Sequence, residues 1–331
     1  MTLAAVLFCI WDAPLVSVII PAYRAAESIA ATLDSVLAQT CHDYEVIVVN
    51  DGSPDSEEME KALEPYRDRI IYVRQENQGP GGARNTGIRM ARGAYVALLD
   101  SDDVWDPEHL AAQVAVLEAD PSIDMVYADA RIIGDVPEAG RTVMEFCPSV
   151  GEVTFKRLVT RECTVHICVS VCRREILLRA GLFDPAFRGT EDIDMWMRIA
   201  RLGGRIAYQR RVLGSYRRQA GSLSSDRVSM VEGFLAVLAK AERDPGLTAA
   251  QRDAVERQVA VERNKLELHK GRNAFLAGDA AAAVSHLRRA NAQHKSLKLA
   301  AVLMLLRVAP GFLRALYQWR DRHVYKLKTQ S

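Results

Sequence analysis

The sequence has no excess of charge of either sign. Its 331 residues contain 43 Lys and Arg against 42 Asp and Glu, which gives a formal net charge of +1. Without a basic excess there is no overall field that would attract nucleic acid, and we expect no nucleic-acid partner. A function that depends on charge must therefore lie in a local cluster.

Cysteine is scarce and irregularly spaced. Six cysteines in a chain of this length do not form a disulfide framework and fit a reducing cytosol. The one local cluster, which comprises Cys163, His166, Cys168 and Cys172, lacks the paired short loops of structural zinc sites. Because the cluster lies in an apolar run, we interpret these residues as buried core residues and assign them no chemistry.

No apolar run reaches the length of a transmembrane helix, which is roughly 20 residues. The N-terminal stretch MTLAAVLFCIW is too short, follows no basic residue and has no convincing cleavage site. A lead-in strand or an upstream start-site artefact explains it better than a signal peptide. We therefore expect a cytoplasmic protein that is soluble or attached peripherally to the inner face of the membrane.

What the sequence does contain is an alternation of β-branched runs and helical patterns. The apolar fraction of 49% is enough for a sizeable core, and the length suggests about two domains. Strands are predicted at residues 16–23, 45–52, 70–75 and 95–100, and helices at 26–40, 55–66, 82–91 and 107–119. Strands buried on both faces that alternate with helices predict an α/β fold with a mostly parallel sheet.

The composition changes near residue 226 to Ala, Arg, Glu and Leu without strand signals. We predict a catalytic domain over residues 12–225 and a helical extension over residues 226–331. Within the extension, residues 271–290 are typical of a helical hairpin that turns at Gly278 and Asp279. This hairpin resembles one tetratricopeptide unit, but a single unit does not predict an array.

Polar residues gather where the predicted strands end. The first strand ends in Pro21, Ala22 and Tyr23, the second in Asn50 and Asp51. The fourth ends in an aspartate cluster, which comprises Asp100, Asp102, Asp103 and Asp106. Ligands of open α/β sheets bind at the carboxyl ends of the strands, so we expect these segments to line one site.

The aspartate cluster needs a compensating charge. Asp100 and Asp102 lie two positions apart and cannot both stay ionised cheaply without a cation or hydrogen-bond donors. A divalent ion, Mg²⁺ or Mn²⁺, supplies that charge and keeps coordination positions open for phosphate oxygens. The alternative is a helix cap, which explains Asp106 before Pro107 but not the first two aspartates.

The glycine-rich segment NQGPGGARNTG, residues 77–87, matches neither of two common phosphate motifs. It lacks the Lys and Ser or Thr of the phosphate-binding loop of NTPases and the third glycine of the dinucleotide fingerprint. We interpret it as a flexible loop that enters a helix and carries Arg84 and Asn85 toward a nucleotide. A plain loop without a ligand is the alternative.

Five segments, in order over about residues 15–225, carry a resemblance to a known family: SVIIPAYR, VVNDGSPD, NQGPGGARNTG, LLDSDD and GTEDIDMWMR. Together they resemble the family 2 glycosyltransferases of the GT-A fold. The resemblance implies a Rossmann-like, mostly parallel sheet flanked by helices. It also implies transfer of a sugar from a nucleotide diphosphate donor, UDP being the expected nucleotide, to a glycan or lipid-linked acceptor with inversion.

The resemblance also implies roles for individual residues. Those expected to bind the nucleotide sugar are Pro21, Ala22, Tyr23, Asp51, Arg84, Asp100 and Asp103. The metal, Mn²⁺ or Mg²⁺, is expected on Asp100 and Asp102, which match the Asp-x-Asp element of the family. Asp192 is expected to act as general base, and Glu191 either to hydrogen-bond the acceptor or to hold the loop.

Two positions depart from the family pattern. Arg24 stands where Asn is common, and it either adds a phosphate contact or points to solvent. Gln219 stands where relatives often carry His, and because Gln is a poorer ligand than imidazole, it puts the third protein contact of the metal in doubt.

The C-terminal tail combines a short apolar run with basic residues and is predicted to form an interfacial helix on an anionic membrane. Beyond Pro310, one helical face carries Arg314, Gln318, Asp321 and Arg322, and another carries Phe312, Leu313, Leu316 and Tyr317. The alternative is a helix that packs on the catalytic domain.

Two other functions compete with sugar transfer. A non-catalytic nucleotide-sugar-binding protein could act as a scaffold through its helical region, and Gln219 mildly favours this alternative. A sugar nucleotidyltransferase needs a glycine- and arginine-rich loop after the first strand, which PAYRAAES does not provide.

Overall fold

A computed structural model of the chain describes residues 13–219, 222, 226–309 and 311–316. The N-terminal apolar run to residue 12 therefore lies outside the described residues, as do Tyr317, Gln318, Asp321 and Arg322 of the predicted tail helix. The chain divides into two compact units with a boundary after Gln219, and residues 135–137 group with the second unit.

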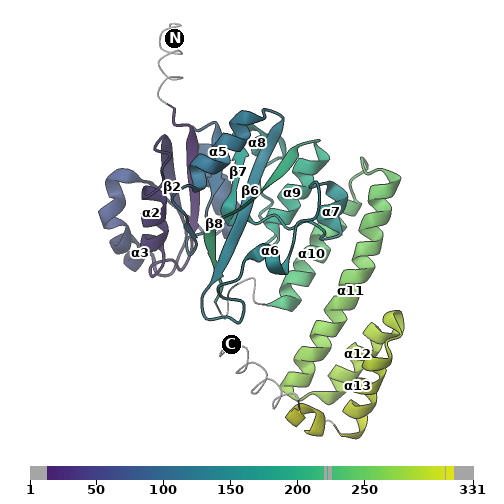
Figure 1. Ribbon diagram of the computed structural model, residues 1–331. Helices are drawn as coiled ribbons and strands as arrows, with labels where there is room; N and C mark the ends of the chain where they lie inside the picture. The colour runs from purple at the N-terminus through teal and green to yellow at the C-terminus, as the bar shows by residue number, and fades with distance from the viewer. Residues whose placement is uncertain (1–12, 220–221, 223–225, 310, 317–331) are drawn as a thin grey trace. The chain divides into compact units, whose positions relative to one another are not determined.

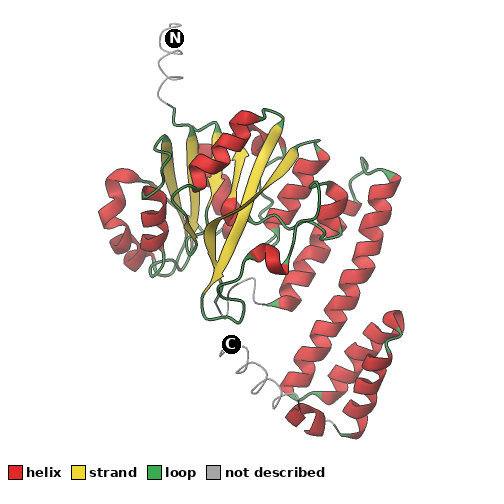
Figure 2. Cartoon of the chain, in the orientation of Figure 1, coloured by secondary structure: helices red, strands yellow, loops and turns green. Residues whose placement is uncertain are grey.

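The first unit is built on one sheet of eight strands in the order β3-β2-β1-β4-β7-β6-β8-β5 (Figure 2). The strands are β1 Val16–Ala22, β2 Tyr44–Asp51, β3 Ile71–Gln75, β4 Tyr95–Leu98, β5 Val104–Trp105, β6 Ile123–Ile133, β7 Ser170–Arg173 and β8 Arg205–Arg217. The pairs formed by β3, β2, β1 and β4 are parallel, as is the pair β6 and β8. The short strand β7 is antiparallel to β4 and β6, and β5 is antiparallel to β8. The prediction of a mostly parallel sheet is confirmed.

The centre of the sheet is apolar on both faces, as the β-branched runs predict. All seven residues of β1 are buried, and Val18 pairs with Val46 of β2 and with Ala97 of β4. Because β1, β2 and β4 are neighbours and parallel, their carboxyl ends meet at one edge of the sheet. The polar segments that follow these strands therefore share that edge.

Helices of the first unit lie on both faces of the sheet (Figures 1 and 2). They are α2 Ile29–Leu37, α3 Ser56–Leu63, the 3₁₀ turn η1 Glu64–Arg69, α4 Gly79–Met90, α5 His109–Ala119, α6 Val143–Phe146, α7 Phe155–Val159, the 3₁₀ turn η2 Ile167–Val169, α8 Arg174–Arg179 and α9 Glu191–Arg201. Helix α5 begins later than predicted, after Glu108, and the side chain of Asp106 does not cap it. Asp106 instead offers its backbone carbonyl to the N–H of His109.

Helix α4 corrects the interpretation of the glycine-rich segment as a flexible loop, since the helix already begins at Gly79. Its glycines are needed for close packing. A Cβ atom on Gly87 would lie 2.4 Å from Cγ2 of Ile19 in β1. Burial of this helix against β1 and β2 outweighs the low helix propensity of glycine, which costs about 1 kcal/mol per residue relative to Ala.

The second unit is helical and comprises α10 Arg227–Glu242, α11 Ala249–Ala277, α12 Ala280–His294 and α13 Leu297–Val308. The hairpin between α11 and α12 turns at the two residues that the sequence indicates. Gly278 has a φ of 89°, and the side chain of Asp279 accepts a hydrogen bond from the N–H of Ala282.

A small apolar core joins α11, α12 and α13, and its buried members are Ala283, Leu287, Leu303 and Leu306. Leu313, which the sequence assigns to the apolar face of the tail helix, packs against this core. In the ranges that the structure describes, every helix is too short or too polar to span a membrane.

Candidate functional site

Arg84 is the centre of the candidate site. Its side chain is buried, with 3% exposure, and its guanidinium donates from Nη1 to Oε1 of Glu191 at 2.6 Å and from Nη2 to Oδ1 of Asp100 at 2.5 Å. Burial opposes the charge of Arg84, but Asp100 and Glu191 outweigh it and raise the pKa of the guanidinium. The two ion pairs hold three elements together: α4, the loop after β4 and the start of α9. Both Nη atoms of this predicted nucleotide-binding residue are thus engaged by carboxylates.

The two acids at the start of α9 differ in their surroundings. Glu191 is 4% exposed, and its second oxygen accepts from the N–H of Gly189 at 2.6 Å. Asp192 is only partly buried, and its Oδ1 accepts from the N–H of Ile193. Burial and then the charge of Glu191 raise the pKa of Asp192 to about 7. The carboxyl of Asp192 can therefore exchange a proton near neutral pH.

Asp100 and Asp102 lie on the loop between β4 and β5. The side chain of Asp100 is 30% exposed, and one of its oxygens faces Arg84. Burial and the charge of Asp100 raise the pKa of Asp102 to about 6, while Arg217 opposes the rise. Arg84 faces Asp100 and Arg217 lies near Asp102, and a divalent cation would further stabilise the ionised form of this pair.

Asp103 makes a contact that the sequence did not indicate. It is 1% exposed, and its Oδ1 accepts from the backbone N–H of Arg217 at 2.7 Å, while Oδ2 is buried without a hydrogen bond of normal geometry. Nε of Arg217 also donates to the backbone oxygen of Asp102. Asp103 thus holds the end of β8 against the aspartate loop, and its carboxylate is not open to a ligand.

Asp51 and the end of β1 lie at the same edge of the sheet. Oδ1 of Asp51 accepts from Nε2 of Gln75 and from the N–H of Gln78, so Oδ2 remains for a ligand. Pro21 and Ala22 are buried, whereas the ring of Tyr23 is 46% exposed. The structure therefore brings the predicted nucleotide-binding segments to one edge of the sheet, where the ring of Tyr23 is exposed and Asp51 is 2% exposed.

The backbone explains why Asn is common at the position of Arg24. Arg24 has a φ of 54°, in the left-handed region that Asn tolerates better than most residues. Its N–H donates to Oγ of Ser53, and its guanidinium lies 5.6 Å from the centre of the Tyr23 ring. The side chain is exposed beside Tyr23.

Gln219 follows the end of β8, two residues after Arg217, and its side chain is exposed. Across the described ranges, no group of three or more His, Cys, Asp and Glu side chains is arranged to hold a metal ion. Asp100 and Asp102 are thus a pair of carboxylates and not part of such a group.

Sequence reasoning missed that His166 and Cys168 lie at this site. Sγ of Cys168 lies 2.9 Å from Nδ1 of His166. Burial and the charges of Asp102 and Asp100 raise the pKa of Asp103, and the thiol of Cys168 opposes this rise. Cys163 and Cys172 are buried, as predicted for the whole cluster. The antiparallel pairing of β4 and β7 brings the cluster to the aspartates, and no local pattern in the sequence signals that pairing.

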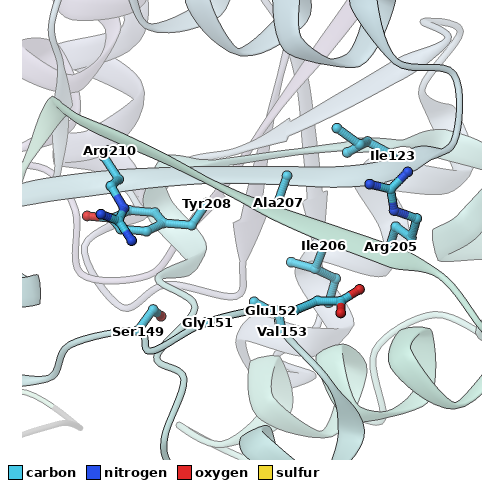
Figure 3. A pocket seen from close by; sticks show the side chains of 10 residues that line it. All are labelled: Ile123, Ser149, Gly151, Glu152, Val153, Arg205, Ile206, Ala207, Tyr208 and Arg210. Atoms are coloured by element: carbon cyan, nitrogen blue, oxygen red, sulfur yellow. The ribbon is translucent and has the colours of Figure 1, made fainter.

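A separate cavity of about 310 Å³ lies against β6 and β8 (Figure 3). Its lining includes Glu152, Arg205, Tyr208 and Arg210, and Arg205 is paired with Asp120. None of the residues expected to bind a nucleotide sugar lines this cavity. The aspartate loop and the start of α9 thus remain the candidate site.

Comparisons with known proteins indicate the family. Residues 17–177 match the model of the family "Glycosyl transferase family 2". The chain is 32% identical over 240 residues to an uncharacterized glycosyltransferase of Rickettsia prowazekii, covering 69% of this chain and 74% of the relative. It is 32% identical over 218 residues to the UDP-Glc:alpha-D-GlcNAc-diphosphoundecaprenol beta-1,3-glucosyltransferase WfgD of Escherichia coli. This match covers 65% of this chain and 82% of WfgD. A longer uncharacterized glycosyltransferase of Rickettsia felis is 33% identical over 194 residues. This match covers 57% of this chain but 32% of that relative.

Two solved structures share the fold. S. aureus TarS 1-349 in complex with UDP-GlcNAc aligns with a TM-score of 0.62 and 19% identity, over 93% of this chain and 91% of that one. The mannosyltransferase PcManGT of Pyrobaculum calidifontis, in complex with GDP-Man and Mn²⁺, aligns with a TM-score of 0.61 and 23% identity. The alignment covers 96% of this chain and 86% of PcManGT. The family model, the sequence relatives and the fold agree, and the chain belongs to glycosyltransferase family 2.

Proposed function

We propose that the chain transfers a sugar from a UDP-linked donor to a hydroxyl of a glycan or lipid-linked acceptor, with inversion at the anomeric carbon. The observation that carries the proposal is the double ion pair of Arg84, because it joins the aspartate loop to the two acids of α9. A donor site and a candidate base are thereby held in one rigid arrangement. The UDP-glucose donor in the name of WfgD supports the choice of UDP.

Asp192 is the proposed general base. In an inverting displacement, the acceptor oxygen bonds to the anomeric carbon while the bond from that carbon to the phosphate oxygen breaks, and UDP leaves with the electron pair. The acceptor hydroxyl gives its proton to a carboxylate as it attacks. A carboxylate with a pKa of about 7 suits this step near neutral pH. Glu191 is a positioning residue in this proposal, since both its oxygens already bind Arg84 and Gly189.

The donor nucleotide is proposed to lie along the carboxyl ends of β1 and β2. Oδ2 of Asp51 would accept a hydrogen bond from an N–H of the base, and the exposed ring of Tyr23 offers a face for stacking. The backbone of Pro21 and Ala22 would line the bottom of the nucleotide site. Arg84 acts indirectly, by fixing Asp100, because its Nη atoms are already engaged.

Asp100 and Asp102 fit a divalent metal, Mn²⁺ or Mg²⁺. Burial and then the charge of Asp100 raise the pKa of Asp102, so a cation would stabilise its ionised form, and hard oxygen ligands suit either ion. When bound, the metal would neutralise charge on the diphosphate leaving group. Arg84 orients Asp100 for this contact through its hydrogen bond to Oδ1.

The proposed function is tested by thermal shift and transfer assays with UDP, UDP-glucose, UDP-GlcNAc and GDP-mannose, each with and without Mn²⁺. We expect the uridine nucleotides to raise the melting temperature with Mn²⁺, because a ligand that binds only the folded state stabilises it by mass action. GDP-mannose serves as the control for base choice. Absence of a shift with all four ligands would contradict the proposal, and a shift without turnover would favour the non-catalytic alternative.

Metal activation is expected to improve when Gln219 is replaced by His. The exposed Gln219 follows the strand end that Asp102 and Asp103 hold, so an imidazole there can reach the ion. A ligand bond worth ~1.4 kcal/mol would lower the Mn²⁺ concentration for half-maximal activation about tenfold. Titration with Mg²⁺ is the control, since imidazole suits Mn²⁺ better than Mg²⁺. An unaltered Mn²⁺ response would show that position 219 does not approach the metal.

We also propose that the helical unit attaches to an anionic membrane surface, where a lipid-linked acceptor would be found. Helix α13 and the residues after it expose Met304, Leu305, Val308, Phe312 and Leu316. A groove of about 440 Å³ on α12 and α13 is lined by Met304 and Val308 together with Arg288 and Arg307. Apolar side chains beside arginines match the boundary between acyl chains and anionic headgroups.

Replacing Val308 and Phe312 with Gln is expected to weaken binding to vesicles of phosphatidylglycerol and phosphatidylcholine. Both side chains are more than half exposed, and withdrawing two apolar side chains from lipid lowers partitioning by about tenfold or more. Cosedimentation measures the effect, and Val261→Gln on α11, also exposed, is the control. Equal binding of the double variant and the control would refute membrane attachment, and a change of oligomeric state instead would point to a second copy of the chain.

A further inference from the structure

His166 lies beside the aspartate loop because of strand pairing. In the antiparallel pair of β4 and β7, Leu98 lies opposite Ser170. The chain that continues from β4 into Asp100 therefore runs alongside the chain that leads into β7, which contains His166 and Cys168. Two contacts fix this second segment: Nε1 of Trp105 donates to the backbone oxygen of Cys168, and the turn η2 contacts β4, β6 and β8.

One side of the imidazole is held by the protein. Nδ1 lies 2.9 Å from Sγ of Cys168, and the ring meets Tyr216 edge-on with 4.4 Å between the ring centres. The residue after Tyr216 donates its N–H to Asp103, so the strand end that the ring meets also contacts the aspartate loop. The orientation of His166 is therefore set by Cys168 and by the strand end that holds the aspartate loop.

The other side of the imidazole is open. The ring is partly exposed, and within the described ranges no hydrogen bond reaches Nε2. Burial lowers the pKa of His166 to about 4, although Asp100 and Asp129 oppose the change, so the ring is neutral at pH 7. His109 provides the contrast, since it is fully buried and stacked on Trp105 and has no access to a ligand.

We propose that Nε2 of His166 hydrogen-bonds a sugar hydroxyl of the reacting substrates, on the transferred sugar or on the acceptor, and that Cys168 positions the ring for this contact. This inference rests on the proposed function. A sugar hydroxyl can donate or accept, so it suits a neutral Nε2 in either tautomer. A phosphate oxygen only accepts, so it suits only the tautomer that carries the proton on Nε2.

The test compares the wild type with His166→Leu, His166→Gln, Cys168→Val and Cys168→Ser in the presence of Mn²⁺. Calorimetry measures binding of UDP and of UDP-glucose, and kinetics measure hydrolysis of UDP-glucose and transfer to GlcNAc-diphosphoundecaprenol, the acceptor of WfgD. We expect UDP binding to stay unchanged in all variants. His166→Gln and Cys168→Ser keep polar groups and should retain most of the wild-type behaviour, whereas Cys168→Val should follow His166→Leu more weakly.

The position of the hydroxyl decides which measurement changes. If it belongs to the transferred sugar, His166→Leu weakens UDP-glucose binding by about tenfold, the effect of one hydrogen bond. If it belongs to the acceptor, UDP-glucose binding and hydrolysis are unchanged and the KM for the acceptor rises about tenfold. An equal loss for UDP and UDP-glucose, or an altered Mn²⁺ requirement, would place His166 at the diphosphate and metal and overturn the inference.

Failure of the inference and failure of the proposed function give different results. If the wild type binds no uridine nucleotide, the proposed function is wrong and the inference falls with it. If the wild type binds and transfers while His166→Leu and His166→Gln both behave like it, only the inference is wrong.

Discussion

Replacement of Asp192 by Asn is expected to lower the rate of sugar transfer by about 100-fold or more, the usual effect of losing a general base. The amide is nearly isosteric with the carboxylate but cannot take the proton of the acceptor hydroxyl. Binding of the donor should stay near the wild-type level, because Asp192 takes no part in the Arg84 ion pairs. The measurement is kcat for transfer, combined with calorimetry of UDP-glucose binding.

The dependence of kcat/KM on pH provides a second test of the role of Asp192. The catalytic form of Asp192 is the deprotonated one, and its pKa is raised to about 7 by burial and by Glu191. The wild-type kcat/KM should therefore fall about tenfold per unit as the pH drops below 7 and level off above it. The residual activity of Asp192→Asn should lack this acid limb.

Glu191→Gln is the comparison variant. It keeps a side chain of the same size next to Asp192 but weakens the contact with Arg84, so we expect a lower melting temperature with an acid limb still present. Full turnover of Asp192→Asn with loss of turnover in Glu191→Gln would reverse the assignment of the two acids. If neither change affected turnover, the proposed mechanism would be wrong.

The strands that frame the site could be predicted because their signal is local. Runs such as VSVIIPA are β-branched and buried along their whole length, and the residues that end them follow directly in the sequence. The start of α9 could also be predicted from the sequence, because acids before an apolar helical pattern indicate a helix N-terminus. These elements carry the segments that the family resemblance indicated, except NQGPGGARNTG, most of which lies on α4.

Other features depend on contacts between distant residues and leave no local pattern. The strand β7 has four residues, and β8 carries several arginines among its apolar residues, so neither resembles the buried central strands. Arg84 and Glu191 are separated by 107 positions, and Asp103 and Arg217 by 114. Spacing arguments reach a few residues and do not indicate these contacts, and it was the family resemblance that assigned Arg84 and Asp103 to the nucleotide sugar.

The ion pairs of Arg84 give the second large effect that we expect. In Arg84→Met, the buried Glu191 loses its partner and Asp100 loses its contact with α4. Removing one member of a buried ion pair costs 3–5 kcal/mol, and because the side chain of Asp100 is 30% exposed, we expect a value near the lower end, about 3 kcal/mol. For a unit of this size that corresponds to a fall of roughly 6–12 °C in melting temperature.

Two further variants separate the pairing from general effects of a substitution in α4. Arg89→Met changes an exposed arginine of the same helix and should melt like the wild type. Arg84→Lys keeps the charge, but a single ammonium lacks the planar fork that reaches both carboxylates, so its stability should lie between those of the wild type and Arg84→Met. Both changes at position 84 should also reduce transfer, since Asp100 and the start of α9 lose their common anchor. Wild-type stability in Arg84→Met would mean that the two carboxylates are solvated or protonated without the arginine, and that Arg84 is free to serve the nucleotide as the sequence first suggested.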